Sequence, residues 1–170
     1  MDNTDLEISN VHFDCITDNV VYDPTGAQGQ WFQHRWGPRN YPQLTLSIDN
    51  ALRHSLKSES VEFMCNYGDP LCWPYLKDFI SNHHKSITIH TYGVVEDSDL
   101  IKYLVQKHVH TIIILDGIEE QCGKVFLGAD WNKILNTICA LRKRCTVKFQ
   151  TCEHNCYQIS KLAKLSKKYK

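Results

Sequence analysis

The stretch "HTIIILDG" at residues 110–117 decides the fold class of this chain. Its four central residues, 112–115, are all large and apolar, and the run ends in Asp116 and Gly117. An apolar run without polar alternation is typical of a strand buried on both faces, which is the usual environment of strands in parallel sheets. Parallel neighbours need a crossover connection, so we expect a helix before and after this strand.

Strand-like and helical segments alternate on both sides of this run. The strands are expected at residues 6–11, 60–65, 86–92, 110–117 and 145–152, and the helices at 45–56, 73–84, 97–108, 130–144 and 155–169. Asp97 or Ser98 is placed to cap the third of these helices, and Asp130 the fourth. Regular alternation predicts right-handed crossovers and a parallel α/β sheet. Five strand–helix units are too few for a closed eight-unit barrel, which leaves a doubly wound sheet or an open partial barrel.

The composition is that of one globular domain spanning residues 1–170. Hydrophobic residues make up 42% of the chain and charged residues 22%, which argues against disorder. Lysine plus arginine equals aspartate plus glutamate at 19 each, so no net charge favours nucleic acid or an anionic membrane as a partner. The N-terminus has no signal-peptide pattern, and no apolar run approaches the ~18 residues of a spanning helix. We therefore expect a cytoplasmic protein with reduced cysteines.

Polar residues gather in the segments that follow the expected strands. These segments are residues 11–18, "NYGDP" (66–70), "HTYG" (90–93), "LDGIEEQ" (115–121) and "TCEHN" (151–155). They are rich in glycine, aspartate, asparagine and histidine. In parallel α/β proteins the ligand site lies at the carboxyl ends of the strands. The sequence therefore predicts a site at this edge of the sheet.

Three segments resemble radical S-adenosylmethionine (radical SAM) proteins, especially a branch common in phage genomes: "EFMCNYGDPL" (62–71), "DGIEE" (116–120) with "GADWNKI" (128–134), and "EHNCYQISKLAKL" (153–165). The resemblance extends from about Leu6 to the C-terminus. It implies an open partial (β/α) barrel of about five units, located in the host cytoplasm if the chain is viral. In this family the motif after the second strand binds the amino group of the methionine moiety, and "NYGDP" stands in its place. The resemblance thus implies weak SAM binding through a set of rim residues: Asn66, Gly68, Asp69, Thr91 and Asp116.

The loop after the first strand carries the clearest departure from the family. Radical SAM proteins have cysteines spaced C-x3-C-x2-C there, which hold a 4Fe–4S cluster, and this frame falls on Val11, Cys15 and Asp18. One thiolate cannot replace three, valine has no donor atom, and a carboxylate is a hard, poor substitute. His12 would need a distortion of the loop to take part. We therefore expect no stable 4Fe–4S cluster, with Cys15 as the remnant of the metal site.

Further departures agree with this expectation. Phe126 and Leu127 occupy the region where the family usually has an arginine, and Tyr92 replaces an asparagine that often follows the third strand. The sixth strand–helix unit of a full core is not found. These differences favour a degenerate protein over a working radical SAM enzyme.

Two of the rim motifs also have a purely structural explanation. In Gly68-Asp69-Pro70, Asp69 could pair with the SAM ammonium, or the three residues could form a turn in which glycine permits positive φ and proline opens a helix. Asp116-Gly117 could line the rim or turn the chain after its strand. For both motifs the turn is the favoured interpretation.

The cysteines of the rim do not form a recognisable metal motif. Cys152, His154 and Cys156 match no structural zinc spacing. Cys65 and Cys72 flank the "NYGDP" loop and are expected as free thiols in a reducing compartment. A metal ion at either place is therefore not expected.

The long segment at about 19–43 is rich in aromatic residues and arginines, as in "QWFQHRWGPRNY" (30–41). It could act as a lid over the barrel mouth or as a surface for a protein partner, with nucleic acid less favoured. The last expected strand would leave an open sheet edge, which invites self-association or a partner. Two functions remain: a catalytically degenerate module that binds a cofactor, a peptide or a protein, or a SAM-dependent enzyme with atypical cluster or metal ligands.

Overall fold

Five strands form one sheet in the computed structural model, which describes residues 8–14, 47–56, 58–65, 69–95, 97–122, 129–151, 153 and 155–169. The strands are β1 (Ile8–Asp14), β2 (Ser58–Met64), β3 (Ser86–Thr91), β4 (His110–Leu115) and β5 (Cys145–Phe149). Every neighbouring pair is parallel, and the order across the sheet is β1-β2-β3-β4-β5. The predicted parallel α/β sheet is therefore confirmed.

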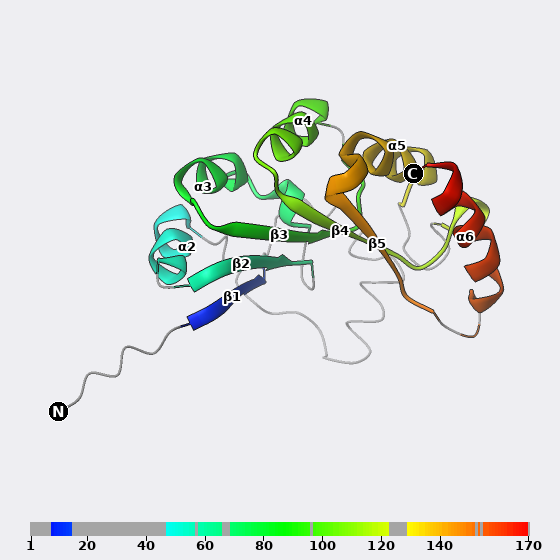
Figure 1. The fold of residues 1–170 in the computed structure, drawn as a ribbon, viewed down its shortest axis with the longest axis horizontal. Helices are drawn as coiled ribbons and strands as arrows, with labels where there is room; N and C mark the ends of the chain where they lie inside the picture. The colour runs from blue at the N-terminus through cyan, green and yellow to red at the C-terminus, as the bar shows by residue number, and fades with distance from the viewer. Residues whose placement is uncertain are drawn as a thin grey trace, which may run out of the picture.

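The helices lie on one side of this sheet. Because the strand order follows the chain order without a reversal, right-handed crossovers place each connecting helix on the same face. Figure 1 shows α2 (Ile48–Ser55), α3 (Leu76–Asn82), α4 (Ser98–Gln106) and α5 (Trp131–Leu141) above the sheet, with α6 (Ile159–Lys168) beyond β5. A doubly wound sheet has helices on both faces and a reversal of strand order. The described residues have neither of these features.

The face toward the helices is apolar. The ring of Phe63 on β2 meets Phe79 of α3 edge-on, with 5.2 Å between ring centroids. Since side chains alternate along a strand, this contact and the register indicate which residues of β2 to β5 face the helices. They include several that are fully buried: Val61, Phe63, Ile89, Ile113 and Leu115. The hydrophobic core therefore lies between the sheet and the helices.

The opposite face, which we call the helix-free face, is largely polar. By the same alternation and register it carries Ser60, Glu62, Thr88, His90, His110, Thr146 and Lys148. Ile112 and Ile114 are the apolar exception on β4, and Ile114 is buried while its neighbour Ile113 is buried on the other face. This confirms that the carboxyl half of β4 is buried on both faces.

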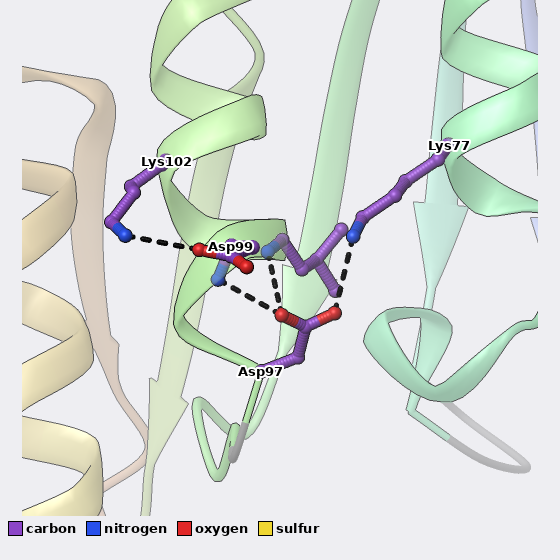
Figure 2. A network of polar contacts seen from close by, with 5 residues as sticks. Lys77, Asp97, Asp99 and Lys102 are labelled. Carbon is purple, nitrogen blue, oxygen red and sulfur yellow. Dashed lines mark hydrogen bonds and ion pairs between the residues drawn. The ribbon is translucent and has the colours of Figure 1, made fainter.

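Side chains at the carboxyl edge also fix the helix starts. Asp97 caps α4: its Oδ1 accepts from the backbone N–H groups of Asp99 at 2.9 Å and Leu100 at 3.0 Å. Its Oδ2 pairs with Lys77 of α3 at 3.2 Å, which ties two neighbouring helices together (Figure 2). Asp130 caps α5 in the same way. Both predicted caps are confirmed.

The predicted end of the first strand is wrong. β1 continues to Asp14, because its backbone stays in register with β2, with Val11 opposite Val61 and His12 opposite Glu62. Residues 11–14 of the loop expected at 11–18 are therefore part of the strand, and Val11 is a strand position. Cys15, Asp18, the aromatic segment at 19–43, Cys152 and His154 lie outside the described residues.

The other four strands end one to three residues before their predicted ends, at Met64, Thr91, Leu115 and Phe149. Helix α5 ends at Leu141 rather than at residue 144, because Arg142 has a positive φ of 48° that a helix cannot continue. None of the helices in the described part of the chain is long and apolar enough to cross a bilayer.

Candidate ligand site at the carboxyl edge of the sheet

Asp69 is buried and its carboxylate is bonded within the protein. Its Oδ1 accepts from the backbone N–H of Leu71 at 3.0 Å, and its Oδ2 from that of Tyr92 at 3.0 Å. The hydroxyl of Thr91 lies 2.8 Å from Oδ1 and 2.7 Å from Oδ2. Asp69 thus caps the short 3₁₀ turn Pro70–Cys72 and joins it to the end of β3.

Burial shapes the electrostatics of this contact. Asp69 is 3% exposed, and burial is the main cause of a raised pKa, opposed by the hydrogen bonds from Thr91 and the two backbone groups. Two predicted site residues, Asp69 and Thr91, are therefore brought together and bind each other. Asn66 and Gly68 lie outside the described residues. Three donors thus already occupy most of the acceptor sites of this carboxylate.

Asp116, at the end of β4, has a different environment. It directly follows Leu115, the last residue of β4, whose carbonyl accepts a hydrogen bond from Gln150 N. Its side chain is 9% exposed, and Oδ2 has no hydrogen-bond partner among the described residues. Burial raises the pKa of this carboxyl to about 7. A group of this kind is able to accept a hydrogen bond or a positive charge from a ligand.

The turn after Asp116 is tightly packed. A Cβ atom at Gly117 would lie 2.9 Å from both the carbonyl carbon and the oxygen of Gln121, so this position has room for glycine only. Asn155 donates from Nδ2 to the carbonyl of Asp116 at 2.8 Å. Gln158 accepts from Ile118 N at 3.1 Å and donates to Ile118 O at 3.3 Å. The start of α6 thus holds the rim loop that carries Asp116.

Sequence reasoning missed Asn155 and Gln158. Both are polar yet buried, 2% and 6% exposed. They belong to "EHNCYQI", one of the segments that resembled the family, but the family motif gave no role for them. In the sequence, these two amide side chains stand three positions apart just before a helix. This pattern is too common to predict a buried contact by itself.

A second missed feature is a histidine–glutamate pair on the helix-free face. Nε2 of His90 on β3 lies 2.9 Å from Oε1 of Glu62 on β2. His90 is buried, and its other ring nitrogen, Nδ1, has no partner in the described part of the chain. In the sequence, Glu62 stands between apolar residues in "VEF", and His90 follows an apolar residue in "TIHT". A polar residue inside each strand-like run was the sign from which this pair could have been found.

The thiols at this edge are neutral and free. Burial raises the pKa of Cys65 and of Cys72 to about 12 and that of Cys122 to about 11, with Asp69 or Asp116 as a nearby negative charge in each case. Cys65 and Cys72 are free thiols in the structure. Within the described ranges, no three His, Cys, Asp or Glu side chains are grouped to hold a metal ion.

Comparison with known proteins bears on the fold. No family model and no curated protein matches the chain. Six chains of solved structures are similar to it, and one of them is TYW1, a radical SAM enzyme, in a structure with a lysine–pyruvate adduct bound. That chain is 20% identical in sequence, with a TM-score of 0.52. The match covers 69% of this chain and 40% of TYW1, so the present chain spans about two fifths of that protein's length. At this identity the likeness shows the fold alone, a parallel α/β sheet similar to part of the TYW1 structure.

Proposed function

We propose that this chain is a radical SAM-like binding module that takes a small cationic cofactor of the S-adenosylmethionine type, without a working iron–sulfur cluster. In this proposal the sheet is an open sector of a (β/α) barrel, the helix-free face is its inner wall, and the protein belongs to a degenerate, phage-type branch. The observation that supports it is the buried Oδ2 of Asp116, which lacks a partner among the described residues at the carboxyl end of β4.

The donor set of the chain does not fit a 4Fe–4S cluster. A cluster of this kind is held by thiolates. Val11, the first position of the family's frame, is a strand residue opposite Val61 and has no donor atom. Cys15 is the one cysteine in the frame, and Asp18 offers a hard carboxylate. We therefore assign no chemical step to a cluster and propose a binding role.

Asp116 suits a cationic ligand. With a pKa of about 7, roughly half of these carboxyl groups carry a proton at neutral pH. A ligand ammonium would supply the missing donor and favour the charged carboxylate, and charge-assisted bonds are the stronger class of hydrogen bond. In this proposal Asp69 and Thr91 shape the rim together with Asn66 and Gly68, and Asp116 meets the ligand.

Calorimetric titration with S-adenosylmethionine tests this assignment. We expect weak binding by the wild type and a loss of about tenfold or more in Asp116→Asn, which keeps the shape but loses the charge. Asp99→Asn is the matched control, because Asp99 is an exposed residue of α4. Binding to the wild type at pH 7 should also release protons, so that the heat depends on the buffer, and Asp116→Asn should lose this dependence. An Asp116→Asn protein with wild-type affinity would contradict the proposal.

A further inference from the structure

The His90–Glu62 pair lies on the helix-free face, and the proposed cofactor contact does not use it. His90 is 7% exposed, and its Nε2 lies 2.9 Å from Glu62 Oε1. Its Nδ1 is buried without a hydrogen-bond partner among the described residues. The register sets Ile112 of β4 beside His90, and isoleucine offers no side-chain donor. The ring is therefore held through Nε2, while Nδ1 is enclosed without a hydrogen bond from the described residues.

The carboxylate of Glu62 determines whether Nδ1 of His90 donates or accepts a hydrogen bond. An ionised glutamate is an acceptor only, so the ring must carry its proton on Nε2 to bond with Glu62. In the neutral imidazole Nδ1 then carries a lone pair and accepts a hydrogen bond. Buried polar atoms in proteins are nearly always bonded, so one without a partner marks a place where a bound molecule would complete the bonding.

We propose that Nδ1 of His90 accepts a hydrogen bond from a hydroxyl group of a small ligand on the helix-free face, a sugar, nucleoside or other polyol. Glu62 is the positioning residue, because it fixes the tautomer and the orientation of the ring. A hydroxyl is the matching donor because a neutral nitrogen forms a neutral hydrogen bond, whereas an ammonium group gains more from a carboxylate such as Asp116. The pair thus adds a hydroxyl-recognising contact to this face.

Two substitutions of His90 distinguish ligand recognition by Nδ1 from a purely structural role of the His90–Glu62 pair. His90→Gln places its amide Nε2 where the ring Nε2 lies, so it keeps the bond to Glu62, but it has no atom at the Nδ1 position. His90→Asn does the reverse, since its amide reaches the Nδ1 position and loses Glu62. A merely structural pair would be preserved by His90→Gln, whereas ligand recognition would be lost in it.

Nitrogen NMR of the full chain labelled at histidine, with D-ribose, adenosine and glycerol as probes, gives the readout. We expect a protonated Nε2 and an unprotonated Nδ1 in the free protein, and a shift of the Nδ1 signal on adding a probe. A response to adenosine alone indicates a nucleoside, and a response to ribose and glycerol as well indicates hydroxyl groups in general. His90→Gln should fold with wild-type stability and bind the active probe at least tenfold more weakly.

Three results would overturn the inference. They are a protonated Nδ1 in the free protein, an Nδ1 signal that none of the three probes moves, and equal probe binding by wild type and His90→Gln. Failure of the cofactor proposal is distinguishable from these, because it concerns Asp116 and S-adenosylmethionine, and a polyol response at His90 would persist without it.

Discussion

Asp69 and Asp116 show how the same residue type, in similar positions after a strand, takes two roles. Asp69 is followed by a proline-led turn and meets three residues that donate to it. Asp116 is followed by a glycine turn and keeps one buried oxygen without a partner in the described residues. The sequence motif marks both as rim residues, but two of the three partners of Asp69 come from the end of β3 and the residue after it, 22 and 23 positions away. Spacing within the motif cannot reveal them.

Asp69→Asn should lower stability. An amide in this place can accept through one atom only, and its NH₂ group would face the donors of Thr91 and Tyr92. We expect the free energy of unfolding to fall by about 1–3 kcal/mol in urea denaturation. Asp78→Asn, at an exposed position of α3, is the control and should change stability little. If Asp69→Asn were as stable as wild type, the carboxylate would not hold the turn to β3.

Asp116 should give the protein a recognisable pH dependence of stability. The pKa of this carboxyl is raised by burial from 3.8 to about 7. Between these two values the folded state binds more protons than the unfolded state, so the contribution of Asp116 to the free energy of unfolding falls as the pH rises from about 4 to about 7. The difference between wild type and Asp116→Asn, followed by denaturation across this range, should show this decline. A flat difference would mean that the folded carboxyl titrates at its ordinary pKa.

At the scale of elements, hydrophobic periodicity predicted the order of strands and helices, whereas tertiary contacts determine where β1 ends and what holds the loop after β4. The strand and helix alternation is as expected from the sequence, as are the caps Asp97 and Asp130. The end of β1 could not be predicted from the sequence, because pairing with β2 extends that strand through residues 12–14, which include His12 and Asp14. The contacts of Asn155 and Gln158 with the loop after β4 could not be read either, since they join residues about 40 positions apart.

Gln158 should fasten α6 to the rim loop. Its amide exchanges two hydrogen bonds with the backbone of Ile118, and both residues are buried. Gln158→Leu removes both and leaves the backbone groups of Ile118 unsatisfied, so we expect a loss of about 2–3 kcal/mol in the free energy of unfolding. Limited proteolysis should then cut before α6 sooner than in wild type. Ser160→Ala, at an exposed position of α6, is the control, and equal behaviour of the two variants would contradict this role.

At the scale of the molecule, helices cover one face of the sheet (Figure 1). This covered face is apolar, and the helix-free face is largely polar. The strand order leaves β1 and β5 each with a single strand neighbour in the described part of the chain. On β5, Lys148 is exposed while Val147 and Phe149 are half-buried. An open edge of this kind is a surface for another strand or another copy. We propose that the aromatic segment, a second copy or a partner protein or peptide covers it.

Light scattering with limited proteolysis separates these occupants. A concentration-dependent dimer indicates self-association, and a monomer whose segment 24–42 resists protease indicates coverage by the chain itself. A monomer that is cut readily in this segment without any loss of stability would contradict both.

We propose that this radical SAM-like fold binds its cofactor through side chains rather than through an open iron. Titration of S-adenosylmethionine into the purified chain, before and after anaerobic treatment with iron and sulfide, tests this most directly. We predict the same weak affinity in both samples, with little iron or sulfide retained. Binding that appears or tightens strongly only after reconstitution, together with near-stoichiometric iron and sulfide, would contradict the account.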